Sequence, residues 1–580
     1  MSFTQLQEIP SENLFLLVGS PGSGKSTFCQ QTVLQNLALD RPIIYVTTKY
    51  GPSKVERALT EQGLQEVAPG LLTFVDAYNE TVGVSITERP DTAYADCNDL
   101  SSIDIAITKL QEQIGRTDIL LVFDSLTSPY LFSGPEILRF MAQTLSRFAA
   151  RGNAIMACMD EGCGKAEDLV AMMSFSSGVI TIRTEADTRL FEVVKHPRMA
   201  PTTIEVPVTV SPPPAIGFYF DIDYVQREAM MMIKGPDVVL RPQMGDLINI
   251  AWRDLIFWSG MLWDPKRFPV LMYESTKASE NPRNTYPLFP WRVKLLFKFM
   301  PKSYSTVKDM KKFMNIGTRA GVEKFGMGTL EYLDEVSKTD EHYMRLREFY
   351  ECWGLENVGA SLGIMRPAML AGSLKGLEQL KGLERDWNVV ETKCLGLGDP
   401  WCELKLVPGE IDGLKDTLAK ESAVIEDVDA RLMDHLLASL LHGKPLMERP
   451  TSGSGVHIHE VQHVTCVPLV SERLQMVFRM GGARTGKLLG ERLLDAGLRE
   501  VEAIKRVVDL MEHCKVGQIT LGETIRMTEN CERFGIKTED QSCYFTTGFL
   551  NGFFSAVTNQ HVKETRCIAT GDPYCEWEFQ

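Results

Sequence analysis

The stretch Gly19-Ser-Pro-Gly-Ser-Gly-Lys-Ser-Thr27 decides the fold of the N-terminal third of this 580-residue chain. It has the spacing G-x-x-x-x-G-K-[ST], it follows the apolar run Leu14–Val18, and a helix-compatible run comes next. Glycines let backbone N–H groups turn inward around phosphate oxygens, and the N-terminus of the following helix adds positive potential. An ordinary glycine-rich turn is disfavoured because strand and helix are both in place. The stretch therefore predicts a phosphate-binding loop.

Each polar side chain of this loop has an expected role. Lys25 would reach the β- and γ-phosphates of ATP, and Ser26 would hold Mg²⁺. Asp124 ends the apolar strand of "DILLVFDSLTSP" and could orient that magnesium through water. Lys25 and Asp124 are the candidate catalytic residues. The residues expected to contact the nucleotide from within the chain are Gly19, Gly22, Ser23, Gly24, Lys25, Ser26, Thr27 and Asp124.

Residues 1 to about 208 alternate short apolar runs with longer amphipathic segments, which predicts an α/β fold with a parallel sheet. The proline triplet of Ser211-Pro-Pro-Pro214 cannot lie inside a helix or a central strand, so we expect a linker at residues 209–214. The apolar runs are Leu14–Val18, Ile43–Val46, Leu71–Val75, Ile119–Phe123, Ala154–Met159 and Val179–Ile182.

This first segment resembles the KaiC-like branch of the RecA-type ATPases, through "GSPGSGKST", "VFDSLTSP" and "SSGVITIRTEADTRLFEVVKHPR". In that family a Lys-x-Arg motif reaches the nucleotide of the neighbouring subunit. Here the motif reads Lys195-His-Pro-Arg198, one residue longer. The resemblance implies a homo-oligomer formed through the ATPase domain, with Lys195 or Arg198 contacting ATP in trans. A solvated basic strand end is an equal alternative.

One position departs from the resemblance. The family places a catalytic Glu just after the second strand, where it activates the attacking water. Here that place reads Lys49-Tyr50, and neither Glu56 nor Asp76 matches it. Without a positioned base, phosphoryl transfer loses one of its standard parts. We therefore expect ATP to bind and to be hydrolysed slowly, so that the chain is a weak ATPase at most and the nucleotide acts mainly as a conformational ligand.

The rest of the chain contains a repeat. "CLGLGDPWCELKLV" from Cys394 and "CIATGDPYCEWEFQ" from Cys567 share their spacing, and "LAGSLKGL" from Leu370 matches "TTGFLNGF" from Thr546. "FMNIGTRAG" (313–321) also matches "FRMGGARTG" (478–486), and Cys352 roughly matches Cys514. These matches predict two copies of one domain. The expected bounds are 215–408 for the first copy, with 215–300 hard to place, 409–430 for a connector and 431–580 for the second copy.

Both copies resemble the 4-vinyl reductase domain family, through the paired glycines, Glu-x-x-Cys and Gly-Asp-Pro-aromatic-Cys. The resemblance implies α/β domains that bind small hydrophobic or aromatic molecules and hold a structural zinc. In the second copy the implied ligands are Cys543, Glu564, Cys567 and Cys575. The first copy offers the weaker set Glu391, Cys394 and Cys402, because the glycine alignment puts Pro367 opposite Cys543. Cys352 would complete it only by folding into reach, and the alternative is small buried hydrophobes.

Two further segments attract interest. "HIHEVQH" places His457 and His459 on one face of an expected strand, with His463 beyond. A partly exposed strand is favoured there over a metal site. Trp252–Trp263 has aromatics at near-helical spacing, for which core packing is the default and a ligand pocket or subunit contact the alternative.

Composition bounds the setting of the chain. The formal net charge of −15 makes a dedicated nucleic-acid binder unlikely. The sequence contains no apolar stretch of about 20 residues and no signal-peptide pattern, so we expect no membrane span. Thirteen cysteines, an odd number, do not look like a secreted disulfide framework, so we expect a cytoplasmic protein.

These expectations describe a cytoplasmic, ATP-binding sensor or regulator that acts on an unknown output protein. An ATP-dependent enzyme or assembly factor for tetrapyrrole or aromatic metabolism is the first alternative. A DNA-recombination-type ATPase is the second, and the acidity disfavours it. A reductase is not expected, because the chain has no dinucleotide-binding fingerprint.

Overall fold

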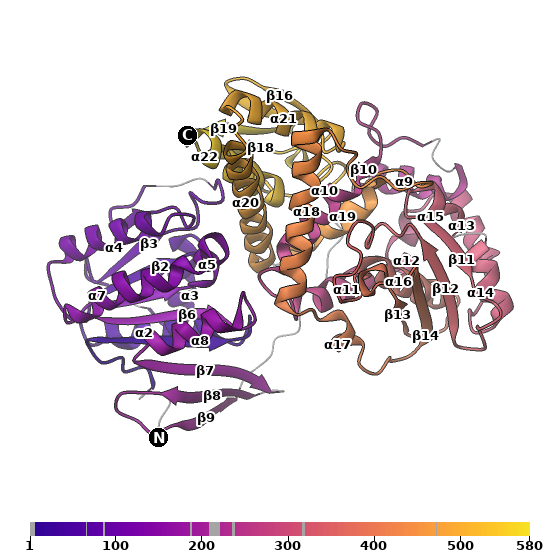
Figure 1. Ribbon diagram of the computed structural model, residues 1–580. Coiled ribbons are helices and arrows are strands. Elements are labelled where there is room, and N and C mark those ends of the chain that lie inside the picture. The colour runs from indigo at the N-terminus through magenta and orange to yellow at the C-terminus, as the bar shows by residue number, and fades with distance from the viewer. Residues whose placement is uncertain are drawn as a thin grey trace. The chain divides into compact units, whose positions relative to one another are not determined.

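The computed structural model describes residues 6–64, 67–84, 88–185, 188–207, 221–234, 238–315, 319–470 and 472–580. The contacts within the chain define two compact units (Figure 1). The first contains Met1–Pro213 and Leu262–Asp264, and the second contains Pro214–Met261 and Pro265–Gln580. The expected linker at residues 209–214 lies outside the described residues.

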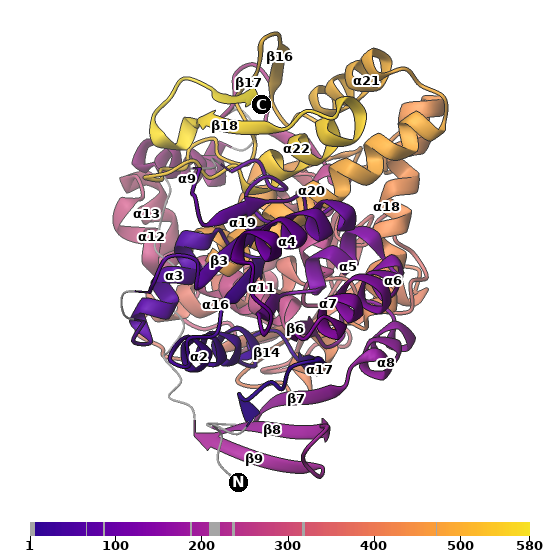
Figure 2. The ribbon, with the colours of Figure 1, turned by 90° about the vertical axis from the view of Figure 1, so that its left-hand side faces the viewer.

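The first unit is built on a nine-stranded sheet of order β4-β3-β2-β5-β6-β1-β7-β8-β9. Strands β4 to β7 of this order run parallel, and β8 and β9 add an antiparallel edge. Figure 2 shows that edge, with β7, β8 and β9 side by side. The parallel α/β fold is confirmed. The strands are β1 (Asn13–Gly19), β2 (Ile43–Thr47), β3 (Leu72–Asp76), β4 (Thr92–Tyr94), β5 (Leu120–Asp124), β6 (Ala154–Asp160), β7 (Gly178–Glu185), β8 (Thr188–Lys195) and β9 (Thr202–Pro207).

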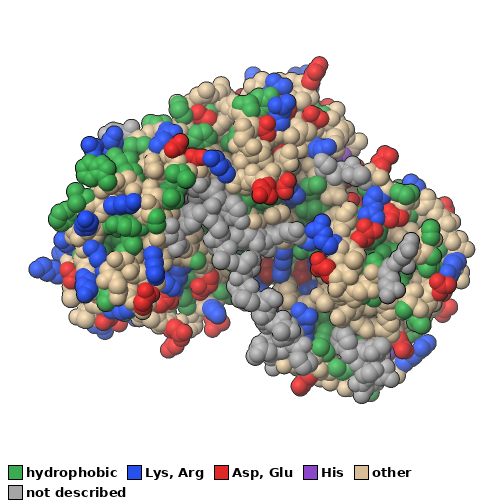
Figure 3. Space-filling model, turned by 180° about the vertical axis from the view of Figure 1, so that it is seen from behind, with side chains coloured by type: hydrophobic (Ala, Val, Ile, Leu, Met, Phe, Trp, Pro, Cys, Tyr) green, Lys and Arg blue, Asp and Glu red, His purple; other side chains and the backbone are tan. Residues whose placement is uncertain are grey.

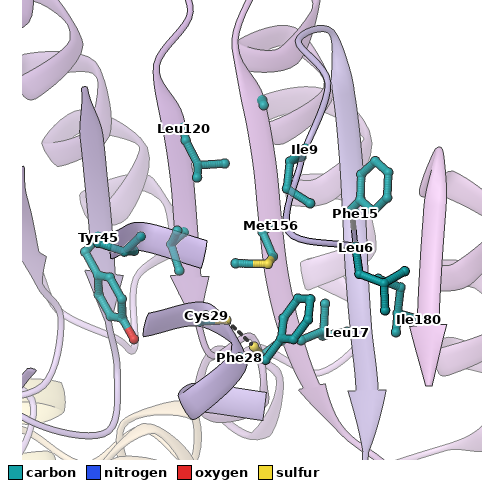
Figure 4. Packing of buried hydrophobic residues seen from close by; sticks show 14 of the residues in the cluster. Leu6, Ile9, Phe15, Leu17, Phe28, Cys29, Tyr45, Leu120, Met156 and Ile180 are labelled. Atoms are coloured by element: carbon teal, nitrogen blue, oxygen red, sulfur yellow. Dashed lines mark hydrogen bonds between the residues drawn. The ribbon is translucent and has the colours of Figure 1, made fainter. Parts of the chain in front are cut away.

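The strands of this sheet are apolar on both faces because helices connect them. Strands β2, β5 and β6 are buried along their whole length, as strands of a parallel sheet covered on both faces are. Part of the core lies between β1, β6 and α2, where Phe28 and Cys29 meet Leu17 and Met156 (Figure 4). The helices are α2 (Lys25–Leu37), α3 (Pro52–Glu61), α4 (Leu100–Ile114), α5 (Thr127–Ser133), α6 (Glu136–Phe140), α7 (Ser146–Ala150) and α8 (Ala166–Phe175), with a π-helical turn at Met141–Leu145.

The second unit contains two four-stranded antiparallel sheets with the same connectivity. Their strand orders are β11-β12-β14-β13 and β16-β17-β19-β18, so each sheet has its third and fourth strands exchanged. A helix of 15 residues, α16 (Met365–Gln379) or α22 (Tyr544–Thr558), joins the second strand to the third. The strands are β11 (Thr329–Tyr332), β12 (His342–Arg347), β13 (Trp387–Lys393), β14 (Cys402–Pro408), β16 (Gln518–Leu521), β17 (Thr524–Thr528), β18 (Val562–Arg566) and β19 (Cys575–Phe579).

The likeness of the two sheets extends to their irregularities. The pairing of the last two strands slips between Glu391 and Lys393 in one sheet and between Glu564 and Arg566 in the other. A short 3-10 turn then follows each slip, at Leu395–Leu397 and Ile568–Thr570. Each turn ends at a glycine with positive φ, which is the backbone conformation that glycine adopts without strain. The two sheets therefore repeat a bulge and a turn at matching places, as the predicted duplication requires.

The repetition begins upstream of the sheets. Strand β10 (Leu247–Asn249) leads into α10 (Ile250–Met261) and α11 (Phe268–Ser279), and β15 (Gly455–His457) leads into α19 (Ile458–Cys466) and α20 (Glu472–Asp495). The two strands pair antiparallel, with Ile248 opposite Val456 at the centre. Helix α11 packs on α16 as α20 packs on α22, which Figure 1 shows for the second pair. Residues 247–279 therefore carry elements that have counterparts in the second copy.

The helix interfaces explain the repeated glycines. A Cβ on Gly372 would stand 2.3 Å from the Lys277 carbonyl oxygen of α11, and one on Gly548 would stand 2.0 Å from the Arg479 carbonyl oxygen of α20. Only a residue without a side chain lets the two backbones approach so closely.

Three expectations about the repeat are wrong. Residues 313–321 lie in and between α14 and α15, just before β11, with 316–318 outside the described residues, whereas 478–486 lie in α20. Cys514 precedes β16, whereas Cys352 follows β12. The boundary expected at residue 430 falls inside the continuous helix α18. The short glycine-containing matches aligned segments that occupy different places in the order of helices and strands of the two copies.

Residues 458–466 also differ from the expectation. They form helix α19 and not a strand, so His459 and His463 lie one helical turn apart, while His457 ends β15. Every residue of α10 is buried, which fits the core packing expected for Trp252–Trp263. The remaining helices are α9 (Ile222–Lys234), α12 (Pro282–Thr285), α13 (Trp291–Lys298), α14 (Val307–Phe313), α15 (Arg319–Lys324), α17 (Leu414–Leu418), α18 (Ser422–His442) and α21 (Glu500–His513), with 3-10 turns at Tyr286–Leu288 and Val467–Val470.

Candidate nucleotide and metal sites

The phosphate loop joins β1 to α2 as the sequence predicts. Gly22 and Gly24 have φ of 81° and 101°, so both need the left-handed conformation that glycine adopts without strain. Lys25 is the first residue of α2, and its ammonium donates to the carbonyl oxygens of Gly19 at 2.6 Å and Ser20 at 2.9 Å. It also forms an ion pair of 2.7 Å with Asp160 at the end of β6. The loop thus surrounds the buried positive charge of Lys25 with its own carbonyl oxygens.

Asp124 lies opposite the loop, at the end of β5. Its Oδ1 accepts a hydrogen bond from Ser26 Oγ at 3.1 Å, and its Oδ2 accepts one from the Tyr45 hydroxyl at 2.9 Å. The hydroxyl expected to hold magnesium and the carboxylate expected to orient it are therefore in contact. Thr27 follows in the first turn of α2 and is half-buried.

Lys49 occupies the position after β2 where an acid is expected. Its ammonium lies 3.3 Å from Asp124 Oδ1, the same oxygen that Ser26 contacts. Burial would lower the pKa of Lys49, but the carboxylates of Asp124 and Asp160 raise this pKa above its usual value. A permanent cation therefore stands beside the candidate magnesium ligands, where a general base would have to be negative or neutral.

The two other acids considered for this role are engaged elsewhere. Glu56 receives two hydrogen bonds from the Arg89 guanidinium, at 2.7 and 2.6 Å. Asp76 accepts from the backbone N–H groups of Tyr78 and Asn79, both at 3.1 Å. Neither carboxylate is directed to the phosphate loop by these contacts.

Arg189 of β8 is a second cation at the loop, and sequence reasoning missed it. A Cβ on Gly24 would stand 2.6 Å from its guanidinium carbon, so the side chain lies directly against the loop. Among the residues that the structure describes, Arg189 Nε and Ser23 Oγ are buried polar atoms without a hydrogen-bond partner. Unpaired donors beside a glycine-rich loop fit an anionic ligand such as a nucleotide phosphate. The alternation of polar and apolar residues along β8 does not indicate that Arg189 lies at the phosphate loop.

The basic pair at the end of β8 lies apart from these contacts. Lys195 is the last residue of the strand, and its ammonium donates to the carbonyl oxygen of Ser176 at 2.6 Å. Arg198 follows in an exposed turn. The contact of either residue with a neighbouring subunit's nucleotide stays a prediction.

The repeated cysteine phrase forms a buried cluster in each copy. The second copy brings together the expected Cys543, Glu564, Cys567 and Cys575. Cys543 Sγ lies 3.4 Å from Cys575 Sγ and 3.7 Å from Cys567 Sγ. Two thiolates bound tetrahedrally to one zinc at about 2.3 Å stand about 3.8 Å apart, whereas a disulfide joins sulfurs at about 2 Å. The separations fit metal ligands.

The first copy also has four donors, which corrects the expectation of a three-ligand remnant. Cys352 folds into reach of Glu391, Cys394 and Cys402, with Cys352 Sγ 3.5 Å from Cys394 Sγ and 3.7 Å from Glu391 Oε1. Pro367 lies in the first turn of α16 and offers no ligand, as expected. The missing thiol comes from the turn after β12, a place that the glycine alignment could not indicate.

The carboxylates of both clusters are held by neighbouring donors. Glu391 Oε2 accepts from Ser361 Oγ at 2.7 Å and from the Gly363 N–H at 2.9 Å. Glu564 Oε2 accepts from Thr547 Oγ1 at 2.9 Å, and its Oε1 is buried without a partner among the described residues. A buried carboxylate oxygen left unpaired beside three thiols fits a metal ligand.

The thiols of each cluster differ in how readily they ionise. Hydrogen bonds from Cys543 and Cys575 lower the pKa of the Cys567 thiol to about 2. Burial raises the pKa of the other two thiols well above the usual value. The first copy shows the same pattern, with the pKa of Cys394 lowered to about 2 by hydrogen bonds from Cys352 and Cys402. The hydrogen bonds within each cluster thus favour ionisation of one thiol, and the thiolate is the form that binds metal.

Comparison with known proteins identifies the two kinds of domain. Residues 3–206 match the KaiC family of ATPases, and residues 524–580 match the 4-vinyl reductase domain. The chain therefore contains a KaiC-type, RecA-like ATPase domain and a 4-vinyl reductase domain, which confirms the first resemblance and, for the second copy, the other. Among the described residues, no helix is long and apolar enough to cross a membrane.

Curated relatives match the ATPase part. A UPF0273 protein of Pyrococcus furiosus is 32% identical over 146 residues, which is 24% of this chain and 57% of the relative. A UPF0273 protein of Pyrococcus horikoshii is 31% identical over 147 residues, again 24% of this chain and 57% of the relative. The chain thus spans little more than half the length of these relatives.

Proposed function

We propose that this chain is an ATP-binding regulatory protein that couples a KaiC-type nucleotide module to two zinc-stabilised domains of the 4-vinyl reductase type that bind a small hydrophobic molecule. The observation that carries the proposal is the pairing of Lys49 with Asp124. A site that keeps Lys25, Ser26 and Asp124 keeps nucleotide binding, but a cation in place of the base removes the activation of water. Such a site suits ATP as a conformational ligand.

The residues that would hold ATP are those of the loop, with Lys25 and Arg189 as cations. Magnesium, when bound, would shield the phosphate charges and would be held by Ser26, with Asp124 behind it. Because Lys49 already offers a positive charge at Asp124 Oδ1, ATP binding should depend less on magnesium than it does at a loop without such a lysine.

Isothermal titration tests the nucleotide site. ATP should bind the wild-type chain, and Lys25→Ala should abolish binding, whereas Lys109→Ala on the exposed face of α4 should not change it. Steady-state hydrolysis should stay below about 1 s⁻¹, the low end of ordinary enzyme rates. ATP affinity unchanged in Lys25→Ala would refute the site, and fast turnover would refute the role of Lys49. Lys49→Glu then asks whether an acid raises the rate.

The trans contact is part of the same proposal. Lys195 and Arg198 would meet the nucleotide of a neighbouring copy, so the mass in solution should rise when ATP and magnesium are added. Light scattering of the wild type and of Lys195→Ala/Arg198→Ala measures this. A monomer at micromolar concentration under both conditions contradicts the proposal.

Figure 3 shows acidic and basic side chains interspersed on the face drawn, which gives no support to a nucleic-acid partner.

One place between α10 of the first copy and α22 of the second favours an aromatic ligand. Trp252 is fully buried, and its ring meets Phe545 and Phe549 of α22 edge-on, with centroids 6.0 and 5.1 Å apart. Its indole N–H has no hydrogen-bond partner among the described residues. An oxygen-bearing aromatic molecule would supply both the stacking surface and the missing acceptor. Native mass spectrometry of the wild type and of Trp252→Phe should show a retained ligand only in the wild type.

A further inference from the structure

Three potential metal ligands meet outside the cysteine clusters. His459 and His463 stand four residues apart in α19, so both project from one face of that helix. Glu280, which follows α11, reaches both: its Oε1 lies 3.1 Å from His459 Nε2 and 2.5 Å from His463 Nε2. The three donor atoms all lie within 4.8 Å of one another. Two imidazole nitrogens and a carboxylate oxygen that converge in this way form the donor set of a transition-metal site.

A fourth side chain orients this set. Glu228 of α9 forms an ion pair with Nδ1 of His459, the nitrogen that faces away from Glu280. Histidines that bind a metal usually donate their other ring N–H to a carboxylate, which fixes the tautomer and makes the ligating nitrogen more basic. The position of Glu228 is the one that this arrangement requires.

The matching place in the first copy carries no ligands. Helices α10 and α19 each begin directly after their paired strands, so Ala251 corresponds to His459 and Leu255 to His463. Both residues of α10 are apolar and buried. A role in folding shared by the two copies therefore does not explain the histidines, since the first copy folds with alanine and leucine there.

We propose that His459, His463 and Glu280 bind a divalent first-row transition metal and leave part of its coordination sphere open. Three protein ligands are the number found in sites that exchange water or a small ligand, whereas closed structural sites use four. The side chains of His459, His463 and Glu280 are 23%, 6% and 18% exposed, so an ion can enter from solvent. The site would thus differ in kind from the two cysteine clusters.

The residues His459-Glu-Val-Gln-His463 also match the H-E-x-x-H spacing of metalloproteases, in which the Glu is the general base. Here Glu460 is fully buried and accepts a hydrogen bond from the Tyr350 hydroxyl through Oε2. The same hydroxyl lies 2.8 Å from Glu351 Oε1, so it bridges two buried carboxyl groups. This engagement in the core assigns metal binding, and not peptide hydrolysis, to the motif.

Cobalt substitution of the full chain tests the proposal. Co²⁺ bound by histidine and carboxylate lacks the intense thiolate charge-transfer absorption that the cysteine clusters give, so the sites can be distinguished by spectroscopy. The single variants His459→Ala, His463→Ala and Glu280→Gln should each lose about one equivalent of cobalt and keep the thiolate bands. Glu228→Gln should weaken binding at this site about 10–100-fold.

His457→Asn is the matched control, because Asn249 holds the corresponding place in the first copy and also caps its helix. It should keep the full cobalt content. Circular dichroism identifies variants that fail to fold. If the ligand variants fail to fold, the cobalt affinity of Glu228→Gln tests the proposal, because this variant leaves all three ligands in place. If cobalt content and affinity are the same in the wild type, His463→Ala and Glu228→Gln, the cluster is a network of charged hydrogen bonds and the proposal is wrong.

Discussion

The two copies of the repeated domain build the same four-donor cluster from different places in the chain. Both take a glutamate and two cysteines from the last two strands and the turn between them. The third thiol comes from Cys352, in the turn after β12, in the first copy, and from Cys543, directly before α22, in the second. The two clusters therefore share their donor set, and not the sequence position of every donor.

The helix beside each cluster is anchored in the same way in both copies. Glu351 accepts from the N–H groups of Ile364 and Met365 at the start of α16, at 2.7 and 3.1 Å. Glu532 accepts from the N–H groups at the start of α22, at 3.2 and 3.0 Å. Cys352 follows Glu351 directly, so the place it occupies is held by Arg533 in the second copy. The third thiol therefore comes from a different residue in each copy, although the N-terminus of the neighbouring helix is anchored in the same way.

Removal of both clusters is the largest test of this likeness. The variant Cys402→Ser/Cys575→Ser should lose about two metal ions per chain, because each copy has four donors. Structural zinc contributes about 10–16 kcal/mol in small zinc domains, comparable to the whole stability of a typical domain. The second unit of this variant should therefore unfold at a much lower temperature than that of the wild type in thermal denaturation. Elemental analysis measures the stoichiometry. If wild-type protein purified without chelator contains no metal, both clusters are packing motifs and the prediction is wrong.

Loss of the third thiol is the sharper comparison. Cys352→Ser and Cys543→Ser should each release about one metal ion and lower the melting temperature, because three donors no longer close the site. Cys466→Ser, at a half-buried cysteine outside both clusters, is the control and should keep both ions. If Cys352→Ser has no effect while Cys543→Ser does, the first copy holds no four-ligand site and the likeness fails.

The helix interfaces give a smaller effect in both copies. Gly372→Ala and Gly548→Ala would each push a methyl group against a backbone carbonyl, so each should reduce the free energy of unfolding by about 1–3 kcal/mol. Gly522→Ala, where a Cβ meets nothing within 4 Å, should be close to neutral. Chemical denaturation measures all three. Equal stability of the three variants would show that the close approach of the helices is not required.

The smallest predicted effect separates the copies. Asn530 Nδ2 donates to Cys543 Sγ at 3.3 Å and to Cys575 Sγ at 3.7 Å. Backbone N–H groups donate to one thiol in both copies: those of Leu362 and Gly396 to Cys394 Sγ, both at 3.3 Å, and those of Ser542 and Ala569 to Cys567. The place of Asn530 is held in the first copy by Phe349, which offers no side-chain donor. Asn530→Ala should thus weaken metal binding about tenfold in the second copy alone. Competition with a chelator measures both sites, and equal loss in the two copies would contradict this.

Much of the first unit could be predicted from its sequence. The strands follow buried apolar runs, and the loop around Lys25 follows from glycine geometry. Lys49 departs from the family pattern in the sequence itself. Arg189 gives no such signal, because its approach to Gly24 depends on how an antiparallel edge strand folds back on the sheet.

The second unit was harder to predict for physical reasons. Cys567 and Cys575 are close in sequence and mark their own cluster, but Cys352 reaches Cys394 only through the tertiary fold. The spacing of His459 and His463 fits a strand or a helix, since positions four apart share a face in both. Only the fold brings Glu280 to them from far along the chain.

The antiparallel pairing of β10 with β15 relates the copies by a local two-fold axis. The pair Leu247–His457 corresponds, under exchange of the copies, to the pair Gly455–Asn249, so the contact is self-complementary, as in an isologous dimer. Here the dimer is written into one chain, and its halves meet at any protein concentration because the linkage sets a high effective concentration. A symmetric homodimer must carry every substitution twice, whereas this chain can change one half alone. That freedom permits a histidine pair in one half and an alanine–leucine pair in the other.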